Sequence, residues 1–110
     1  MQRFQSANDE EDEKRQLTKL RDQRSTVRAK IKIIRSEIAR GVEMVGSRAN
    51  LTMLLAQVED LLRKSHKLTD RICMFQYHVD TAYEFKEQLY YQRKVQDIKE
   101  EVLLYFRDLS

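Results

Sequence analysis

The sequence predicts an all-α protein, an elongated three-helix bundle in up-down-up order, and three observations support this class. The 110 residues contain no proline and only two glycines, and helix interiors tolerate few of either residue. Charged residues make up 35% of the chain, which suits helices with large exposed faces. Apolar residues recur three and four positions apart, the period of a helix with one apolar face. We expect one helical domain over residues 9–110, preceded by a disordered tail over residues 1–8.

The first helix is predicted over about residues 9–45. Five acidic residues, Asp9–Glu13, stand in its first turns, where carboxylates oppose the positive end of the helix dipole. Gly41 and Gly46 mark a turn, and Ser47 and Asn50 are candidate caps for the next helix. The residues at heptad positions a and d, which should form its core face, are Leu17, Leu20, Val27, Ile31, Ile34 and Ile38.

The second and third helices are predicted over about residues 50–79 and 82–109. The apolar face of the second is wide enough to contact more than one helix, because Leu55 and Leu62 extend it. Beyond it the register shifts by two residues, and Thr81-Ala-Tyr-Glu84 has the form of a capping box. The core residues predicted on the second helix are Leu54, Val58, Leu61, Leu68, Ile72, Phe75 and Val79. The offset series after the shift is Val95, Ile98, Val102, Tyr105 and Leu109.

The shift in register leaves two architectures open. In the first, the chain folds back near residue 80, so that three helices of similar length cover one another. In the second, one helix continues from residue 51 to residue 109, reaching roughly 90 Å, and dimerises as a coiled coil with a second copy. We favour the first. In both, the first two helices run antiparallel, with facing positions that sum to about 95, so that Leu20 faces Phe75 and Val27 faces Leu68.

Arg24 is the one polar residue in the apolar series of the first helix. We interpret it as an arginine that sets the helix register and extends its head to water or to Asp70. The alternative is the central arginine layer of a vesicle-fusion helix bundle, but too few apolar layers flank it for that.

A basic row of Lys14, Arg21, Arg28 and Arg35 repeats every seventh residue at heptad position e. One interpretation is a charge ladder, in which Glu101 and Asp108 of a parallel third helix meet Arg28 and Arg35. The alternative is a contact surface for nucleic acid or an anionic membrane. No base-reading motif accompanies the row, so such nucleic-acid binding would not depend on sequence.

Catalytic, metal and membrane motifs are not found in the sequence. The two histidines and Cys73 lack metal-ligand spacing, and there is no phosphate loop or nucleophile elbow. We expect neither an enzyme nor a cofactor, a metal or a small-molecule substrate. No apolar run reaches the ~20 residues of a membrane span. A lone cysteine and the lack of a secretory signal favour an intracellular protein, cytoplasmic or nuclear.

The pattern resembles one family. The run LTKLRDQRSTVRAKIKIIRSEI, followed by LTMLLAQVEDLLRKSHKLTDRI and the aromatic segment EFKEQLYYQRKVQDI, resembles the N-terminal helical region of gag-like polyproteins from Bel/Pao-type retrotransposons. The resemblance spans most of residues 16–109 and implies a structural assembly region without catalytic residues.

The function predicted from these observations is a non-catalytic helical module for self-association or for docking a partner helix, with a gag-like structural role as one form of it. The alternatives are a nucleic-acid-binding module that uses the basic row and a coiled-coil adaptor subunit of a hetero-complex.

Overall fold

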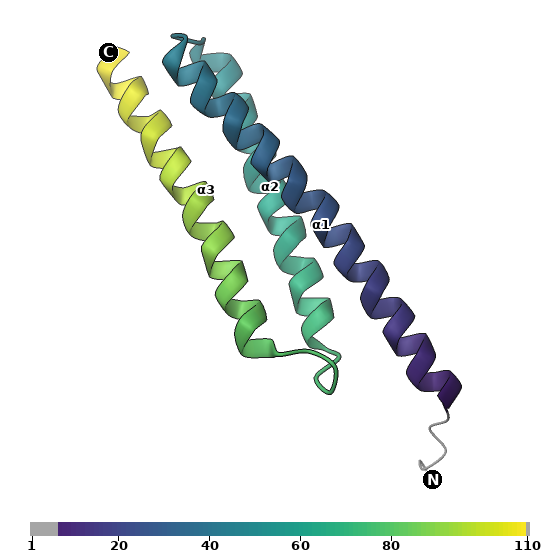
Figure 1. Ribbon diagram of the computed structural model, residues 1–110. Coiled ribbons are helices and arrows are strands. Elements are labelled where there is room, and N and C mark those ends of the chain that lie inside the picture. Colours follow the sequence, from purple (N-terminus) through teal and green to yellow (C-terminus); the bar gives the residue numbers. More distant parts are fainter. Residues whose placement is uncertain (1–6, 110) are drawn as a thin grey trace.

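Three helices form an elongated up-down-up bundle (Figure 1). The computed structural model describes residues 7–109, with side chains from residue 9. The helices are α1 (Ala7–Glu43), α2 (Arg48–Cys73) and α3 (Thr81–Leu109), and the bundle measures 67 × 20 × 15 Å. The predicted all-α class and the three-helix order are confirmed, and the alternative of one helix through residues 51–109 is wrong. Of the predicted tail at residues 1–8, residues 1–6 lie outside the described residues, and α1 already includes residues 7 and 8.

The first turn ends α1 with a Schellman motif. The Gly46 N–H donates to the Gly41 carbonyl at 2.6 Å, and the Val45 N–H donates to the Val42 carbonyl at 3.3 Å. Val45 takes the left-handed conformation (φ 56°), which is usually given to glycine. Gly46 is required for space instead, because an added Cβ would lie 2.9 Å from the Gly41 carbonyl oxygen. Of the two candidate caps, Ser47 is the N-cap of α2: its Oγ accepts from the Asn50 N–H at 3.1 Å.

The second connection covers residues 74–80, and it shortens the predicted second helix. α2 ends at Cys73 rather than near residue 79, because the Met74 and Phe75 N–H groups bond three residues back, to Arg71 and Ile72. Asp80 then caps α3, with its Oδ1 accepting from the Tyr83 N–H at 3.1 Å. The cap is therefore one residue before the predicted capping box. Glu84 does not reach back to this cap, because its carboxylate points into the bundle.

The hydrophobic core lies in the half of the bundle that contains the first turn and the C-terminal part of α3. Each fully buried aliphatic side chain there contributes about 1.5–3 kcal/mol. The Tyr105 hydroxyl holds the end of α3 to the first turn by donating to the Gly46 carbonyl at 2.9 Å. The buried members of this core are Ile31, Ile38, Leu51, Leu55, Val58, Val95, Ile98 and Val102.

The predicted core positions of the first two helices are all at least half-buried. Five are buried: Leu17, Ile31, Ile38, Val58 and Ile72. The half-buried ones are Leu20, Val27, Ile34, Leu54, Leu61, Leu68, Phe75 and Val79.

Candidate functional site

The predicted basic row does not form one surface. Lys14 and Arg21 are exposed, whereas Arg28 and Arg35 are half-buried beside α3. The Arg28 guanidinium lies 4.4 Å from the centroid of the Tyr91 ring, and its Nη1 is 3.4 Å from Glu87 Oε1. A continuous basic footprint for a polyanion is therefore interrupted after Arg21.

The prediction of the acidic partners of the basic row is wrong: the observed partner of Arg28 lies two heptads before the predicted one. Arg28 pairs with Glu87, whereas Glu101 and Asp108 are exposed. The reason is where α3 begins. The 74–80 connection returns the chain beside Arg24, so that the first turn of α3 already faces the middle of α1.

Arg24 points into the bundle, which corrects the prediction that its head extends to water or to Asp70. Its Nη1 donates to Thr69 Oγ1 at 3.0 Å and to Glu84 Oε1 at 2.5 Å. Arg24 is only 8% exposed and Glu84 only 5%. A buried carboxylate requires a partner of opposite charge, and Arg24 is that partner. The ion pair joins α1 to α3, and the hydrogen bond to Thr69 adds α2.

A second polar layer lies one helical turn further along α1 and is less well satisfied. Arg28 Nε and Nη2, His66 Nε2 and Gln88 Oε1 are buried without a hydrogen-bond partner among the described residues. Burial lowers the pKa of Arg28, and the neighbouring Arg24 charge lowers it further. Burial likewise lowers the pKa of His66, with Asp70 acting in the opposite direction and Arg28 in the same one. The layer therefore disfavours additional positive charge.

Near the polar layers, the described residues offer neither a reactive thiol nor a cluster of metal ligands. Burial raises the pKa of the Cys73 thiol, with Glu84 and Asp70 adding to the effect, so the thiol stays protonated and is a weak nucleophile. Within residues 7–109, no group of three His, Cys, Asp or Glu side chains is arranged to hold a metal ion. These polar groups connect α3 to the other two helices.

A groove between α1 and α2 is the strongest candidate for a binding site. Two antiparallel helices have a long groove on each side, and α3 fills only one of them. Along the other, two contiguous cavities of about 690 and 540 Å³ share Gln23 and Arg71. Their lining comes from α1, α2 and residues 74–78, with no residue of α3. We call this the α1–α2 groove.

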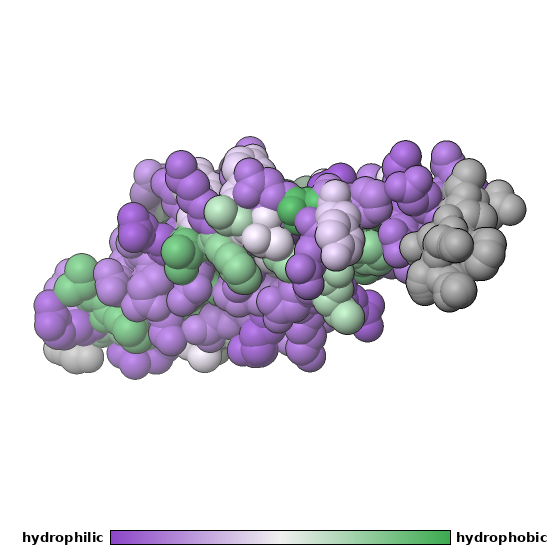
Figure 2. Space-filling model, turned by 90° about the horizontal axis from the view of Figure 1, so that it is seen from below, coloured by the Kyte–Doolittle hydropathy of each residue, from purple (hydrophilic) through white to green (hydrophobic). Residues whose placement is uncertain are grey.

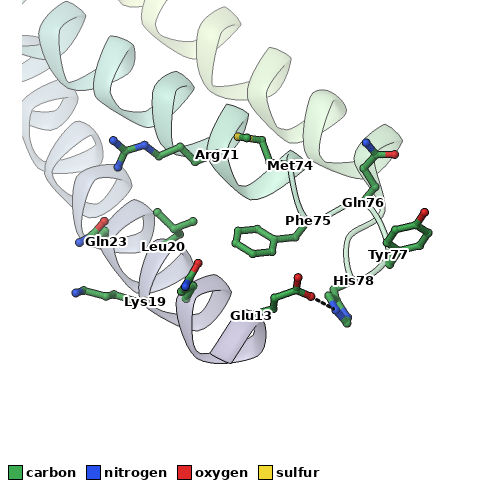
Figure 3. A pocket seen from close by; sticks show the side chains of 11 residues that line it. Glu13, Lys19, Leu20, Gln23, Arg71, Met74, Phe75, Gln76, Tyr77 and His78 are labelled. Carbon is green, nitrogen blue, oxygen red and sulfur yellow. Dashed lines mark hydrogen bonds and ion pairs between the residues drawn. The ribbon is translucent and has the colours of Figure 1, made fainter. Parts of the chain in front are cut away.

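The α1–α2 groove has an apolar floor and a charged rim. Leu20, Val27, Leu68 and Phe75 line it and are half-buried. Figure 3 shows the Leu20 side chain and the Phe75 ring pointing toward one another across the groove. Both thus lie at the same level of the hairpin, as the predicted antiparallel register requires.

One end of the groove is closed by a contact between α1 and the second connection. His78 Nε2 lies 3.3 Å from Glu13 Oε1, and Figure 3 draws this pair at the foot of the cavity. α1 extends past the ends of both other helices at this level (Figure 1). The residues of the connection therefore cover part of the extension, and Leu17 is buried there.

The outer surface is mainly hydrophilic, with separate hydrophobic patches, as one face shows (Figure 2). One patch lies at the end of the molecule that carries the C-terminus, where Leu103, Leu104 and Leu109 are exposed. No helix within the described residues is long and apolar enough to cross a membrane.

Comparisons with protein-family models, with curated proteins and with solved structures find no match. The resemblance to gag-like polyproteins therefore stays a prediction.

The α3 residues of the polar layers were not predicted from the sequence, although the sequence contains a signal for them. Extending the Val95, Ile98, Val102 series backwards in steps of three and four reaches Tyr91, Gln88 and Glu84. All three are α3 residues of the polar layers, whereas Glu87, which pairs with Arg28, lies outside this series. The groove rim carried no such signal, since exposed lysines are ordinary on any helix.

Proposed function

We propose that this chain is a non-catalytic helical assembly module that receives an amphipathic helix in the α1–α2 groove. The observation that carries the proposal is the uncovered apolar floor of this groove, opposite the side that α3 fills. A helix placed there would complete a four-helix arrangement around the α1–α2 hairpin.

The dimensions of the groove suit a helix better than a small molecule. Its lining runs on α1 from Glu13 to Val27, a rise of about 21 Å at 1.5 Å per residue. Four half-buried apolar side chains along that length offer successive contacts for residues at i, i+3 or i+4, and i+7 of an incoming helix.

The test is to titrate the chain with a synthetic 21-residue helix that has leucine at the a and d positions, glutamine at the flanking positions and one tryptophan. The chain has no tryptophan, so the fluorescence change belongs to the peptide alone. Leu68→Ser, in the groove floor, should weaken binding about tenfold or more, because it removes roughly two buried methylene equivalents.

The matched control is Leu104→Ser on the exposed face of α3, which should bind as the parent does. Circular dichroism should show that both variants stay helical. No binding at about 1 mM peptide, equivalent to about −4 kcal/mol, would overturn the proposal. So would a loss of binding caused by Leu104→Ser alone.

A further inference from the structure

Three of the four Lys and Arg side chains that line the α1–α2 groove form no ion pair within the described residues. Lys19, Lys67 and Arg71 line the groove and are exposed. None of the three forms an ion pair with a described carboxylate, whereas Lys64 lies 3.5 Å from Asp60. Cations with no internal role leave the rim ready for negative charge from outside.

The carboxylates of the groove do not neutralise these cations. Glu13 lies against His78 at 3.3 Å, which leaves Asp70 as the other acidic residue in the lining. The lining therefore has four Lys and Arg residues against two carboxylates, an excess of two positive charges. This charge borders an apolar floor on both helices, with Lys19 on α1 and Lys67 and Arg71 on α2.

The floor argues against a polyanion as the natural occupant. A nucleic acid or an anionic headgroup would neutralise the rim, but its phosphates would leave Leu20 and Phe75 facing water or charge. Met74 beside them is 77% exposed. An occupant that satisfies both floor and rim needs an apolar stripe flanked by negative charge.

A second copy of this chain does not present such a surface within the described residues. The acidic run Asp9–Glu13 contains no apolar side chain. α3 exposes several apolar side chains, but its exposed charges nearly cancel, with three cations against four carboxylates. The described residues of this chain therefore do not supply the complementary helix, and a separate acidic helix fits the groove better.

We infer that the partner helix of the α1–α2 groove is acidic, with leucine-type side chains on one face and glutamate or aspartate at the flanking positions opposite Lys19, Lys67 and Arg71. This inference rests on the proposed function and adds the chemical class of the partner. Charges at the rim of an apolar contact select among amphipathic helices, whereas the apolar floor would accept many of them.

The experiment compares three tryptophan-labelled 21-residue peptides with one leucine stripe and with glutamate, glutamine or lysine at the flanking positions. The glutamate peptide should bind about tenfold tighter than the glutamine peptide, since several exposed ion pairs act together, and the lysine peptide should bind weakest. Raising the salt concentration should reduce the difference in affinity between the glutamate and glutamine peptides.

Charge reversal on the protein supplies the matched variants. Lys19→Glu with Lys67→Glu should invert the order, so that the lysine peptide binds tightest. Lys86→Glu with Arg93→Glu, at two exposed positions of α3, changes the net charge equally and should keep the parent order. Because all four positions are exposed, both variants should keep the parent circular dichroism spectrum.

The outcomes separate the two proposals. Equal binding of all three peptides would overturn the acidic partner and leave the docking function standing, whereas binding by none of them would remove both. Binding of a 20-nucleotide uridine RNA or of phosphatidylserine vesicles that is lost in Lys19→Glu with Lys67→Glu, and is not displaced by the glutamate peptide, would overturn the inference. So would a dimer in light scattering that this peptide does not dissociate.

Discussion

The two halves of α3 pack against the hairpin by different chemistry. Its C-terminal half places Val95, Ile98 and Val102 in the apolar core. Its N-terminal half places Glu84, Gln88 and Tyr91 at the corresponding heptad positions, where they meet Arg24 and Arg28 of α1. One helix thus changes from a polar to an apolar seam along its length.

The difference separates stability from specificity. Aliphatic side chains in the apolar half contribute roughly in proportion to their buried area and tolerate sliding of one helix along another. The Arg24–Glu84 pair is costly to bury and stabilises little over an apolar pair, but it fits only one register. We infer that the apolar half holds α3 and that the polar half determines where it lies.

The polar half also leaves buried groups unsatisfied. An unpaired buried donor or acceptor costs about 1–3 kcal/mol. Four such atoms lie on Arg28, His66 and Gln88, against one in the apolar half, Arg35 Nε, beside Ile98. Local opening starts in the parts of a structure with the lowest stability. We therefore expect the N-terminal half of α3 to open before the C-terminal half.

The largest effect should come from breaking the buried ion pair. Arg24→Met leaves the Glu84 carboxylate buried without its partner and should lower the free energy of unfolding by about 3–5 kcal/mol. Adding Glu84→Leu should recover most of that loss, because two apolar residues replace two charges of the same seam. Urea titrations of both variants and the parent give the double-mutant cycle.

If Arg24→Met lowers the free energy of unfolding by less than about 1 kcal/mol, the ion pair is not the main contact of the polar half. The double variant also tests the register. If the ion pair determines where α3 lies, the double variant should unfold less cooperatively than the parent even where its stability recovers. Full recovery of both stability and cooperativity would show that packing alone sets the register.

A smaller contrast comes from one substitution in each half of α3. Ile98→Ala, in the apolar half, removes a side chain that is 7% exposed and should cost about 2–4 kcal/mol. Gln88→Leu, in the polar half, removes an amide oxygen that has no partner and should leave stability unchanged or raise it by up to about 1 kcal/mol. Thermal and urea unfolding measure both.

A large loss of stability in Gln88→Leu would contradict the proposed difference between the two halves of α3. If Gln88→Leu costs as much as Ile98→Ala, then Gln88 makes a contact on which the N-terminal half of α3 depends. The two halves would then not differ in the way that their side chains indicate.

The sequence predicted the parts of the fold that follow from periodicity. The three-four spacing of Ile31, Ile38 and Val58 placed them in the core, and the antiparallel register matches the shared lining of Leu20 and Phe75. Such patterns are local, so they survive without knowledge of neighbouring elements.

What the sequence could not predict depends on where α3 lies along α1. A six-residue difference in the end of α2, at Cys73 rather than Val79, moves the start of α3 back beside Arg24. It accounts for six of the fourteen residues that separate the observed partner of Arg28, Glu87, from the predicted one, Glu101. Nothing local to either residue encodes that choice, since it follows from the length of the 74–80 connection and from burial of the Arg24–Glu84 pair.

The smallest expected effect is a dependence of stability on pH. It tests whether the polar half of α3 responds to protonation more than the apolar half does. Burial lowers the pKa of His66 below the 6.5 of a free histidine, and the Arg28 charge acts in the same direction. Below about pH 6.5 the unfolded chain therefore binds a proton at His66 that the folded chain resists, so stability should fall as the pH is lowered from about 7.5 to 5.5.

His66→Gln should reduce this fall, whereas the control His78→Gln should retain it, because His78 lies outside the polar layers, against Glu13. Amide protection factors, which correct for the slower intrinsic exchange at lower pH, should fall first in residues 81–94 of α3 and stay high in residues 95–109. An equal fall of the protection factors in both parts, or an undiminished loss of stability in His66→Gln, would mean that protonation acts on the bundle as a whole rather than through the polar half of α3.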